Sequence, residues 1–264
     1  MRKIAIIGSG NMGSAIAASL RGDDARITCT AATQATLDRI KTEFPDVEVT
    51  SDNIEAVKDA DMIVLAVKPY VAPRVIEEIR DHIRPDAVII SVVAVMPIAE
   101  LRARLDNGSR NLKILRVVPN TAIKYDKSVT FIAAADDVEN DVIAETEEIF
   151  NRSGKAFVVK ESELPACTAL ASCGIAFFLR FIRAAAEGSV ELGMKAGFAT
   201  EVAALTAEGA AALLAGGAHP EAEIDKVTTP GGITIKGLNA LEANGFTNAV
   251  ISALRASCVT TAQK

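Results

Sequence analysis

Short, almost uninterrupted apolar runs recur along the first 160 residues of the chain, and stretches with apolar positions at helical spacing separate them. Runs of this kind are typical of strands that are buried on both faces of a parallel sheet. Helical spacing, for example at residues 71–83 and 142–150, predicts connecting helices. The alternation predicts an α/β fold with a doubly wound, mostly parallel sheet. We expect its strands at residues 3–7, 26–30, 47–50, 61–67, 87–93, 112–118, 129–133 and 156–159.

The pattern changes after residue 160, because no later segment has a convincing strand pattern. Residues 200–215 are nearly all Ala, Leu, Val and Thr, with Glu201 and Glu208 as their only charges. A helix that is apolar almost all round must be buried in a large core or in an oligomer. About 100 residues offer little core of their own. We therefore predict a sheet domain at residues 1–160 and an all-helical domain at residues 161–264 that a second subunit shares.

A glycine-rich segment, Gly8-Ser-Gly-Asn-Met-Gly13, follows the first predicted strand and precedes a run at helical spacing. A dinucleotide-binding fingerprint requires this context of strand, turn and helix. In that fingerprint Gly8 makes the turn, Gly10 lets the backbone approach a pyrophosphate, and Gly13 lets helix and strand pack closely. We predict a Rossmann-type dinucleotide-binding domain, the alternative being a strand-to-helix turn without a ligand.

The end of the second predicted strand bears on the choice of cofactor. An NAD-binding site usually has an acidic residue there, which binds the ribose hydroxyls. The segment Thr30-Ala-Ala-Thr33 has none, and this favours NADPH, whose 2′-phosphate a carboxylate would repel. The segment also has no arginine, and the sequence does not show which way Arg39 on the next helix faces. We predict NADPH as the cofactor, with NADH as the alternative.

Polar residues directly follow two buried strands, at the edge where open α/β sheets bind their ligands. Lys68 comes after strand 61–67 and is expected either near a cofactor ribose or phosphate or in solvent. The fixed φ of Pro69 suits the first turn of the next helix. Asn120 follows strand 112–118. It is a candidate for contact with the nicotinamide or the substrate, or else an ordinary turn residue.

A second glycine turn occurs late in the chain, in the segment Lys-Val-Thr-Thr-Pro-Gly-Gly-Ile-Thr-Ile-Lys-Gly at 226–237. Gly231 and Gly232 give the backbone freedom just before a predicted helix. Thr229 and Thr234 would then lie around a helix N-terminus, where N–H groups and the helix dipole favour a carboxylate or phosphate. The alternative is a turn that only caps the helix.

Composition narrows the chemistry further. The net charge of −6 over 264 residues argues weakly against a nucleic-acid partner. The four cysteines have no metal-ligand spacing, and with only two histidines neither a zinc site nor a Ser-His-Asp triad is expected. The N-terminus lacks a signal-peptide pattern, and the longest uncharged run, 164–179, is shorter than the roughly 20 residues of a membrane helix. We expect a cytoplasmic protein with reduced thiols and no metal.

Several motifs together, in this order, resemble the pyrroline-5-carboxylate reductases, which catalyse the last step of proline biosynthesis. The late Thr/Ser-Pro-Gly-Gly-x-Thr-Ile motif is specific to that family, whereas the other motifs are weaker singly. The likeness runs nearly from end to end of the chain. The matching segments are residues 8–13, 53, 66–69, 116–121, 227–235, 237–238 and 241–242.

The resemblance implies NAD(P)H-dependent reduction of the cyclic imine 1-pyrroline-5-carboxylate to L-proline by a Rossmann domain followed by a helical dimerisation domain. It also implies a homodimer, which in this family often assembles into larger rings. The substrate carboxylate would bind at Thr229, Gly231, Gly232 and Thr234, and we expect the Thr234 hydroxyl to act as the catalytic group by hydrogen-bonding the imine nitrogen. The implied cofactor-binding residues are Gly8, Gly10, Asn11, Met12, Gly13, Asn53, Val67, Lys68 and Pro69.

The chain departs from the family pattern at positions that line the implied pocket. Tyr70 stands where Gln is common, Val95 where Gly is usual and Ala122 where Pro is usual. Ile175 replaces the Pro of a Gly-Ser-Gly-Pro-Ala motif. These departures leave the substrate and the level of activity open.

Two alternative functions follow from the same features. One is a related Rossmann oxidoreductase that acts on another imine or on a hydroxyacid. β-Hydroxyacid dehydrogenases resemble one another in a Lys-x-x-x-Asn pair, which this chain lacks because Lys195 is followed by Ala199. The other is a catalytically weak, reductase-like protein that binds nucleotide and has a regulatory role.

Overall fold

The computed structural model describes residues 2–21, 25–106 and 112–258. Contacts divide the chain into two compact units, one that extends to Ser172 and one that begins at Cys173. The first helical turns after residue 160 belong to the sheet unit, since α7 (Leu164–Cys167) contacts strand β7 and both Leu164 and Ala169 are buried. The functional boundary between residues 160 and 161 remains our proposal.

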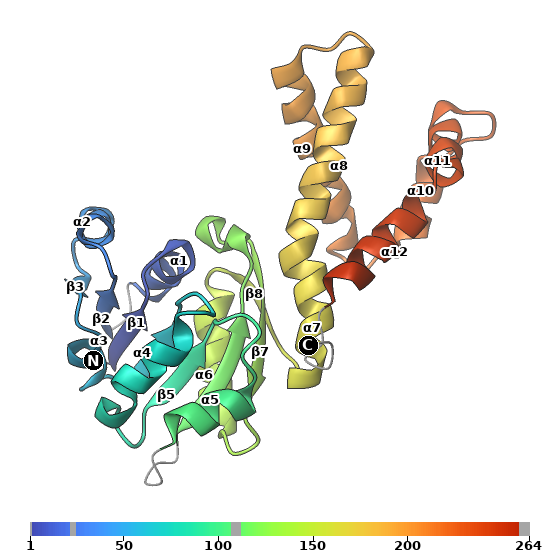
Figure 1. The fold of residues 1–264 in the computed structure, drawn as a ribbon. Coiled ribbons are helices and arrows are strands. Elements are labelled where there is room, and N and C mark those ends of the chain that lie inside the picture. The colour runs from blue at the N-terminus through green and yellow to red at the C-terminus, as the bar shows by residue number, and fades with distance from the viewer. Residues whose placement is uncertain (1, 22–24, 107–111, 259–264) are drawn as a thin grey trace. The chain divides into compact units, whose positions relative to one another are not determined.

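Eight strands form a single sheet in the first unit, in the order β3-β2-β1-β4-β5-β6-β7-β8 (Figure 1). All neighbouring strands are parallel except β6 and β7, which are antiparallel. The doubly wound, mostly parallel sheet predicted from the apolar runs is therefore confirmed. The strands are β1 (Arg2–Ile7), β2 (Ala25–Thr30), β3 (Glu48–Thr50), β4 (Met62–Leu65), β5 (Val88–Ser91), β6 (Lys113–Val118), β7 (Ser128–Ala134) and β8 (Gly154–Val158).

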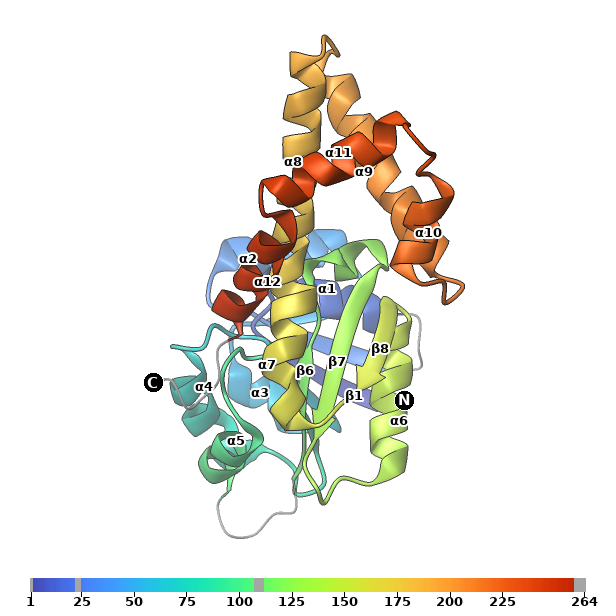
Figure 2. The same ribbon diagram turned by 90° about the vertical axis from the view of Figure 1, so that its right-hand side faces the viewer.

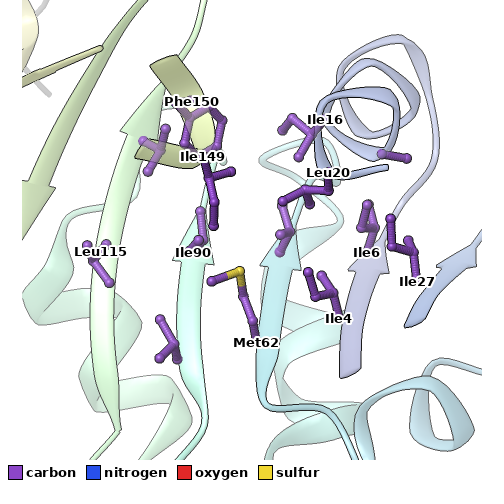
Figure 3. Close-up of a cluster of buried hydrophobic side chains, with 14 of the residues drawn as sticks. Ile4, Ile6, Ile16, Leu20, Ile27, Met62, Ile90, Leu115, Ile149 and Phe150 are labelled. Atoms are coloured by element: carbon purple, nitrogen blue, oxygen red, sulfur yellow. The ribbon is translucent and has the colours of Figure 1, made fainter. Parts of the chain in front are cut away.

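The helices of this unit cover both faces of the sheet. Side chains of α1 (Asn11–Leu20) and α6 (Asn140–Asn151) pack in one apolar cluster with Ile6 and Met62 (Figure 3). Helix α2 (Gln34–Glu43) contributes Ile40 to the same cluster. Side chains of α3 (Asn53–Val57), α4 (Ala72–Ile79) and α5 (Ile98–Leu105) pack in a second cluster on the opposite face. Burial of one such isoleucine stabilises the fold by roughly 1.5–3 kcal/mol. The strands have uninterrupted apolar sequences because helices bury their side chains on both faces of the sheet.

The order of the strands reverses at β1, whose two neighbours are β2 and β4. In the parallel register, Ile7 pairs with Thr30 on one side and with Leu65 on the other. The carboxyl ends of these three strands therefore lie at one edge. Such a switch point is where open α/β sheets bind their ligands.

The prediction that Pro69 opens a helix is wrong. Helix α4 begins at Ala72, and Pro69 lies in the turn before it. The carbonyl of Lys68 accepts hydrogen bonds from the N–H groups of Val71 (2.9 Å) and Ala72 (3.1 Å), which closes that turn. Pro73, not Pro69, takes the position in the first helical turn that suits a fixed φ.

All secondary-structure elements assigned in the described residues of the second unit are helices, joined by turns. A π-helical stretch (Thr168–Cys173) leads into α8 (Gly174–Glu191). Helices α8 and α9 (Ala196–Leu214) lie side by side (Figures 1 and 2). They are followed by α10 (Pro220–Lys226), α11 (Ile233–Ala243) and α12 (Phe246–Ser257).

Helix α9 leaves most of its apolar surface uncovered within the single chain. Phe198, Leu205 and Leu213 are 59%, 60% and 57% exposed, and Ala199 is its only buried residue. Helical stretches Glu161–Glu191 and Ala196–Leu214 are also long and apolar enough to cross a membrane, by length and composition alone. The core helices of soluble proteins pass the same test. The exposed side chains agree with the prediction that this surface is shared with another subunit.

Candidate active site

The first glycine loop has the geometry of a close backbone turn. Gly8 has a φ of +96°, which side-chain-bearing residues rarely adopt. A β-carbon on Gly13 would lie 2.1 Å from the carbonyl oxygen of Gly8, so helix α1 packs directly on the turn. A β-carbon on Gly10 would meet no atom within 4 Å. The loop thus has one side packed against the fold and one side open to a ligand.

Helix α1 starts at this open side. Gly10 is its N-cap residue, and no side chain caps the helix. The N–H groups of Asn11, Met12 and Gly13 therefore point out of the first turn, where the helix dipole favours an anion. Asn11 is exposed and Met12 packs partly against the core. These residues fit a dinucleotide pyrophosphate, as predicted from the sequence; their role in binding it remains a proposal.

Thr30, at the end of β2, connects the loop to the predicted nucleotide contact Asn53. Its hydroxyl accepts a hydrogen bond from the Gly8 N–H (3.2 Å) and donates one to Asn53 Oδ1 (2.7 Å). The Asn53 amide also donates to Glu78 Oε1 (3.2 Å). The structure thus brings Asn53 beside the glycine loop. Sequence reasoning missed Thr30, because nothing in a strand-end threonine shows which neighbour it will bond.

The neighbouring Cys29 thiol is buried in the sheet. Burial raises the pKa of this thiol above its ordinary value. The thiol is therefore protonated at neutral pH and is not a nucleophile.

The end of β4 supplies a further wall of the loop. A β-carbon on Gly8 would lie 2.7 Å from Cγ1 of Val67, so this side chain packs on the turn. Lys68 and Pro69 follow at the same edge and are exposed, and Tyr70 beyond them is 85% exposed. The structure therefore places Val67 against the glycine loop, and contact of residues 67–69 with a cofactor remains a proposal.

Asn120 is almost fully buried and its amide bonds to the protein itself. Its Oδ1 accepts from the Ala122 N–H (3.0 Å), and its Nδ2 donates to the carbonyl of Ala171 (3.2 Å). These bonds hold the turn after β6 against the start of the helical run. A direct contact of Asn120 with substrate remains a proposal.

A carboxylate that the sequence did not single out lies at the start of α5. Glu161 Oε1 accepts from the N–H of Ile98 (2.7 Å) and from Arg116 Nη1 (2.9 Å). Because Pro97, the N-cap residue of α5, offers no side-chain cap, Glu161 satisfies this helix end from a distant segment. The two hydrogen bonds of Glu161 fix the segment that follows Val95. Val95 has a φ of +57°, which is rare for a β-branched residue.

The second glycine turn, in the helical unit, has the geometry predicted for an anion site. The Gly232 N–H donates to the carbonyl of Thr229 (2.9 Å), and Gly231 has a φ of +72°. Pro230 and Gly231 at the centre of such a turn are typical of type II. Helix α11 begins at Ile233 with Gly232 as its N-cap and without a side-chain cap. The N–H groups of its first turn can therefore bind a carboxylate.

The threonines around this turn differ in what they contact. The Thr228 hydroxyl donates to carbonyls at the end of α10, at 3.2 Å from both Ile224 and Asp225, so it closes that helix. Thr229 and Thr234 are exposed. A β-carbon on Gly232 would lie 2.5 Å from Thr229 Oγ1, so only glycine fits there without displacing that side chain. Thr229, Gly231, Gly232 and Thr234 thus cluster as predicted, and their contact with substrate remains a proposal.

A surface hollow of about 530 Å³ lies in the sheet unit. It is lined by charges of both signs, including the ion pair between Arg26 and Glu48 (2.6 Å). None of the predicted site residues lines it.

The fold and the glycine loop define a protein with a Rossmann-type dinucleotide-binding domain. Two family models match the chain. Residues 3–95 match the family model described as "NADP oxidoreductase coenzyme F420-dependent". Residues 161–264 match the family model described as "Pyrroline-5-carboxylate reductase dimerisation".

Relatives with known names cover nearly the whole chain. Pyrroline-5-carboxylate reductase 2 of Dictyostelium discoideum is 38% identical over a match of 270 residues that covers 96% of this chain and 90% of the relative. The solved reductase of Streptococcus pyogenes is 26% identical, with a TM-score of 0.88 over 97% of this chain and 96% of that one. The Plasmodium falciparum pyrroline carboxylate reductase with NADP bound is 25% identical, with a TM-score of 0.84 over 97% and 95% of the two chains. The chain belongs to the pyrroline-5-carboxylate reductase family.

Proposed function

We propose that this chain reduces the C=N bond of 1-pyrroline-5-carboxylate, with a reduced nicotinamide dinucleotide, to give L-proline. The observation that carries the proposal is the glycine turn before α11. It offers uncapped N–H groups and two exposed threonine hydroxyls in a chain of this family. A small ring whose carboxylate is on the saturated carbon next to the imine nitrogen matches these donors.

The chemistry needs orientation more than a reactive side chain. A cyclic imine is basic, so it arrives protonated and its carbon is electrophilic. The bound cofactor supplies the hydride, and neither a nucleophile nor a metal is required. The task of the protein is to hold the reacting atoms about 3–3.5 Å apart.

We assign separate roles to the residues of the glycine turn. Backbone N–H groups from Gly231 to Thr234 hold the carboxylate. The Thr234 hydroxyl accepts a hydrogen bond from the protonated imine nitrogen, and after hydride transfer it relays a proton from water to the resulting amine. Because a hydroxyl is a poor acid, Thr234 acts mainly by orienting the ring.

The cofactor residues divide along the sheet edge. Gly8, Gly10 and the first turn of α1 hold the pyrophosphate. Asn53 contacts the nucleotide, and Val67 to Pro69 lie beside the ribose and nicotinamide end. The absence of a carboxylate in Thr30–Thr33 supports NADPH as the preferred form, with NADH as a weaker donor.

We also propose a cytoplasmic homodimer that forms through the helical unit and associates further into a ring. The exposed apolar side chains of α8, α9 and α12 support the dimer, because water contact over such an area is unfavourable. Burial in a shared helical surface also explains why two helical stretches are long and apolar enough to cross a membrane.

An absorbance assay tests the proposed reaction. Purified protein is mixed with NADPH and 1-pyrroline-5-carboxylate, and the loss of reduced cofactor is followed while L-proline is measured. We expect rapid, stoichiometric conversion. Reduction of NADP⁺ by a β-hydroxyacid, without turnover of the imine, would assign the chain to the hydroxyacid dehydrogenases. NADPH binding with neither reaction would support a regulatory protein.

A further inference from the structure

Helix α2 carries a positive charge onto the first glycine loop. Arg39 lies in the second turn of this helix, and its Nη2 donates to the carbonyl of Ser9 at 3.0 Å. Ser9 stands between Gly8 and Gly10, on the part of the loop next to the end of β2. The guanidinium thus reaches the place where the ribose of the adenosine half of a dinucleotide binds in this fold.

The surroundings of Arg39 favour an anion. The segment Thr30–Thr33 after β2 contains no acidic residue. The hydroxyls of Thr33 and Thr36 share a hydrogen bond of 2.9 Å at the start of α2 and offer further polar atoms. The Arg39 side chain is 45% exposed, so a ligand can reach it.

Arg39 has donors beyond its contact with Ser9. Its Nη1 donates to Glu43 Oε2 at 3.0 Å, one helical turn further on. A guanidinium has five N–H donors, and these two bonds use two of them. An exposed pair four residues apart on a helix is weak. A doubly charged phosphate can therefore compete with Glu43 for the guanidinium.

We propose that Arg39 determines cofactor specificity by binding the 2′-phosphate of NADPH. A planar guanidinium can form two parallel hydrogen bonds to a phosphate, which a ribose hydroxyl cannot match. The residue contacts only the adenosine end, so it selects the cofactor and takes no part in hydride transfer. The inference rests on dinucleotide binding in the proposed function, and it is independent of the identity of the imine.

Calorimetric titration with adenosine fragments tests the proposal without turnover. The ligands are adenosine 2′,5′-bisphosphate and adenosine 5′-monophosphate, which differ only in the 2′-phosphate. We expect the unmodified protein to bind the bisphosphate at least 10-fold more tightly. Arg39→Ala should weaken bisphosphate binding roughly 10- to 100-fold, the range for a hydrogen bond to a charged group, and leave monophosphate binding unchanged.

Two further variants serve as controls. Arg104→Ala removes the arginine of another helical pair, with Glu100 at 2.9 Å on α5, and should change neither affinity. Glu43→Gln removes the competing carboxylate, keeps Arg39, and should tighten bisphosphate binding about 2- to 5-fold. It therefore tests the same contact if Arg39→Ala does not fold.

Three results would overturn the proposal. Equal affinity of the unmodified protein for both fragments would show that no 2′-phosphate site exists. Equal weakening of both fragments by Arg39→Ala would assign Arg39 to holding the loop through Ser9. An unchanged bisphosphate affinity in Arg39→Ala, or in Glu43→Gln where Arg39→Ala does not fold, would place the phosphate elsewhere. Failure of imine reduction in the turnover assay leaves each of these readouts unaffected.

Discussion

Val95 holds a left-handed backbone conformation, with a φ of +57°, at a position where the family pattern has glycine. Its side chain is 51% exposed, so packing of that side chain offsets little of the free-energy cost of this conformation. The following segment is fixed by Glu161, which accepts from the Ile98 N–H, and by burial of Met96. The surrounding bonds therefore maintain a conformation that valine itself disfavours.

Replacing Val95 with glycine should stabilise the chain. The left-handed conformation costs a side-chain-bearing residue roughly 1–2 kcal/mol, and the greater freedom of glycine in the unfolded chain offsets about 0.5–1 kcal/mol of the gain. We expect a net increase in the free energy of unfolding of about 0.5–1 kcal/mol by urea denaturation. Val95→Ala is the control and should gain less, because alanine keeps the β-carbon. A loss of stability in Val95→Gly would show that the valine side chain makes a stabilising contact.

Thr234 is the residue whose hydroxyl the proposed mechanism needs. Thr234→Ala should reduce kcat/KM for the imine roughly 10- to 100-fold, the range for one hydrogen bond to a charged group. The dissociation constant of NADPH should stay the same. Thr234→Ser keeps the hydroxyl and should retain most of the activity. Full activity in Thr234→Ala would remove Thr234 from the mechanism.

At the scale of elements, two glycine turns precede uncapped helices, α1 and α11, and both present N–H groups. They differ in packing. The first turn is fixed by Val67 and Thr30, whereas a β-carbon on Gly231 would meet no atom within 4 Å. A side chain at position 231 would therefore destabilise the turn only through the φ of +72°.

Gly231→Ala should therefore deform the substrate turn. We expect a loss of about 1–2 kcal/mol in the free energy of unfolding and a rise in KM for the imine with little change in NADPH affinity. Gly216→Ala is the matched control, since Gly216 is also in a loop with open space but lacks a positive φ. An unaltered KM in Gly231→Ala would argue against carboxylate binding at this turn.

The eight strands and the helix starts at both glycine turns could be predicted, because burial on two faces leaves apolar runs and glycine marks the turns. The predicted run at 61–67 was longer than strand β4, because Ala66 and Val67 are apolar residues of the loop. Pro69 was misplaced because a second proline, Pro73, stands four residues later in the first turn of the helix, and the bonds to the Lys68 carbonyl keep Pro69 in the turn before it. Thr30, Arg39 and Glu161 could not be found from spacing, since each acts on a residue more than 20 positions away.

At the scale of the whole molecule, the apolar surface of the helical unit predicts an obligate dimer. Light scattering during gel filtration should give a mass at least twice that of one chain. Leu205→Glu, on the exposed face of α9, places a charge in the expected interface and should weaken association by about 3 kcal/mol or more. A monomer in the unmodified protein, or a dimer that Leu205→Glu leaves intact, would show that α9 is not the shared surface.

The most direct test of the account follows the reducing hydrogen into the product. The protein is incubated with 1-pyrroline-5-carboxylate and NADPH that carries deuterium at nicotinamide C4. Two preparations are used, one labelled on each face of the nicotinamide ring. Proline is then examined by mass spectrometry and NMR. We expect one deuterium per molecule of L-proline, on the ring carbon that was double-bonded to nitrogen. Proline without deuterium from either labelled face, or no proline at all, would contradict it.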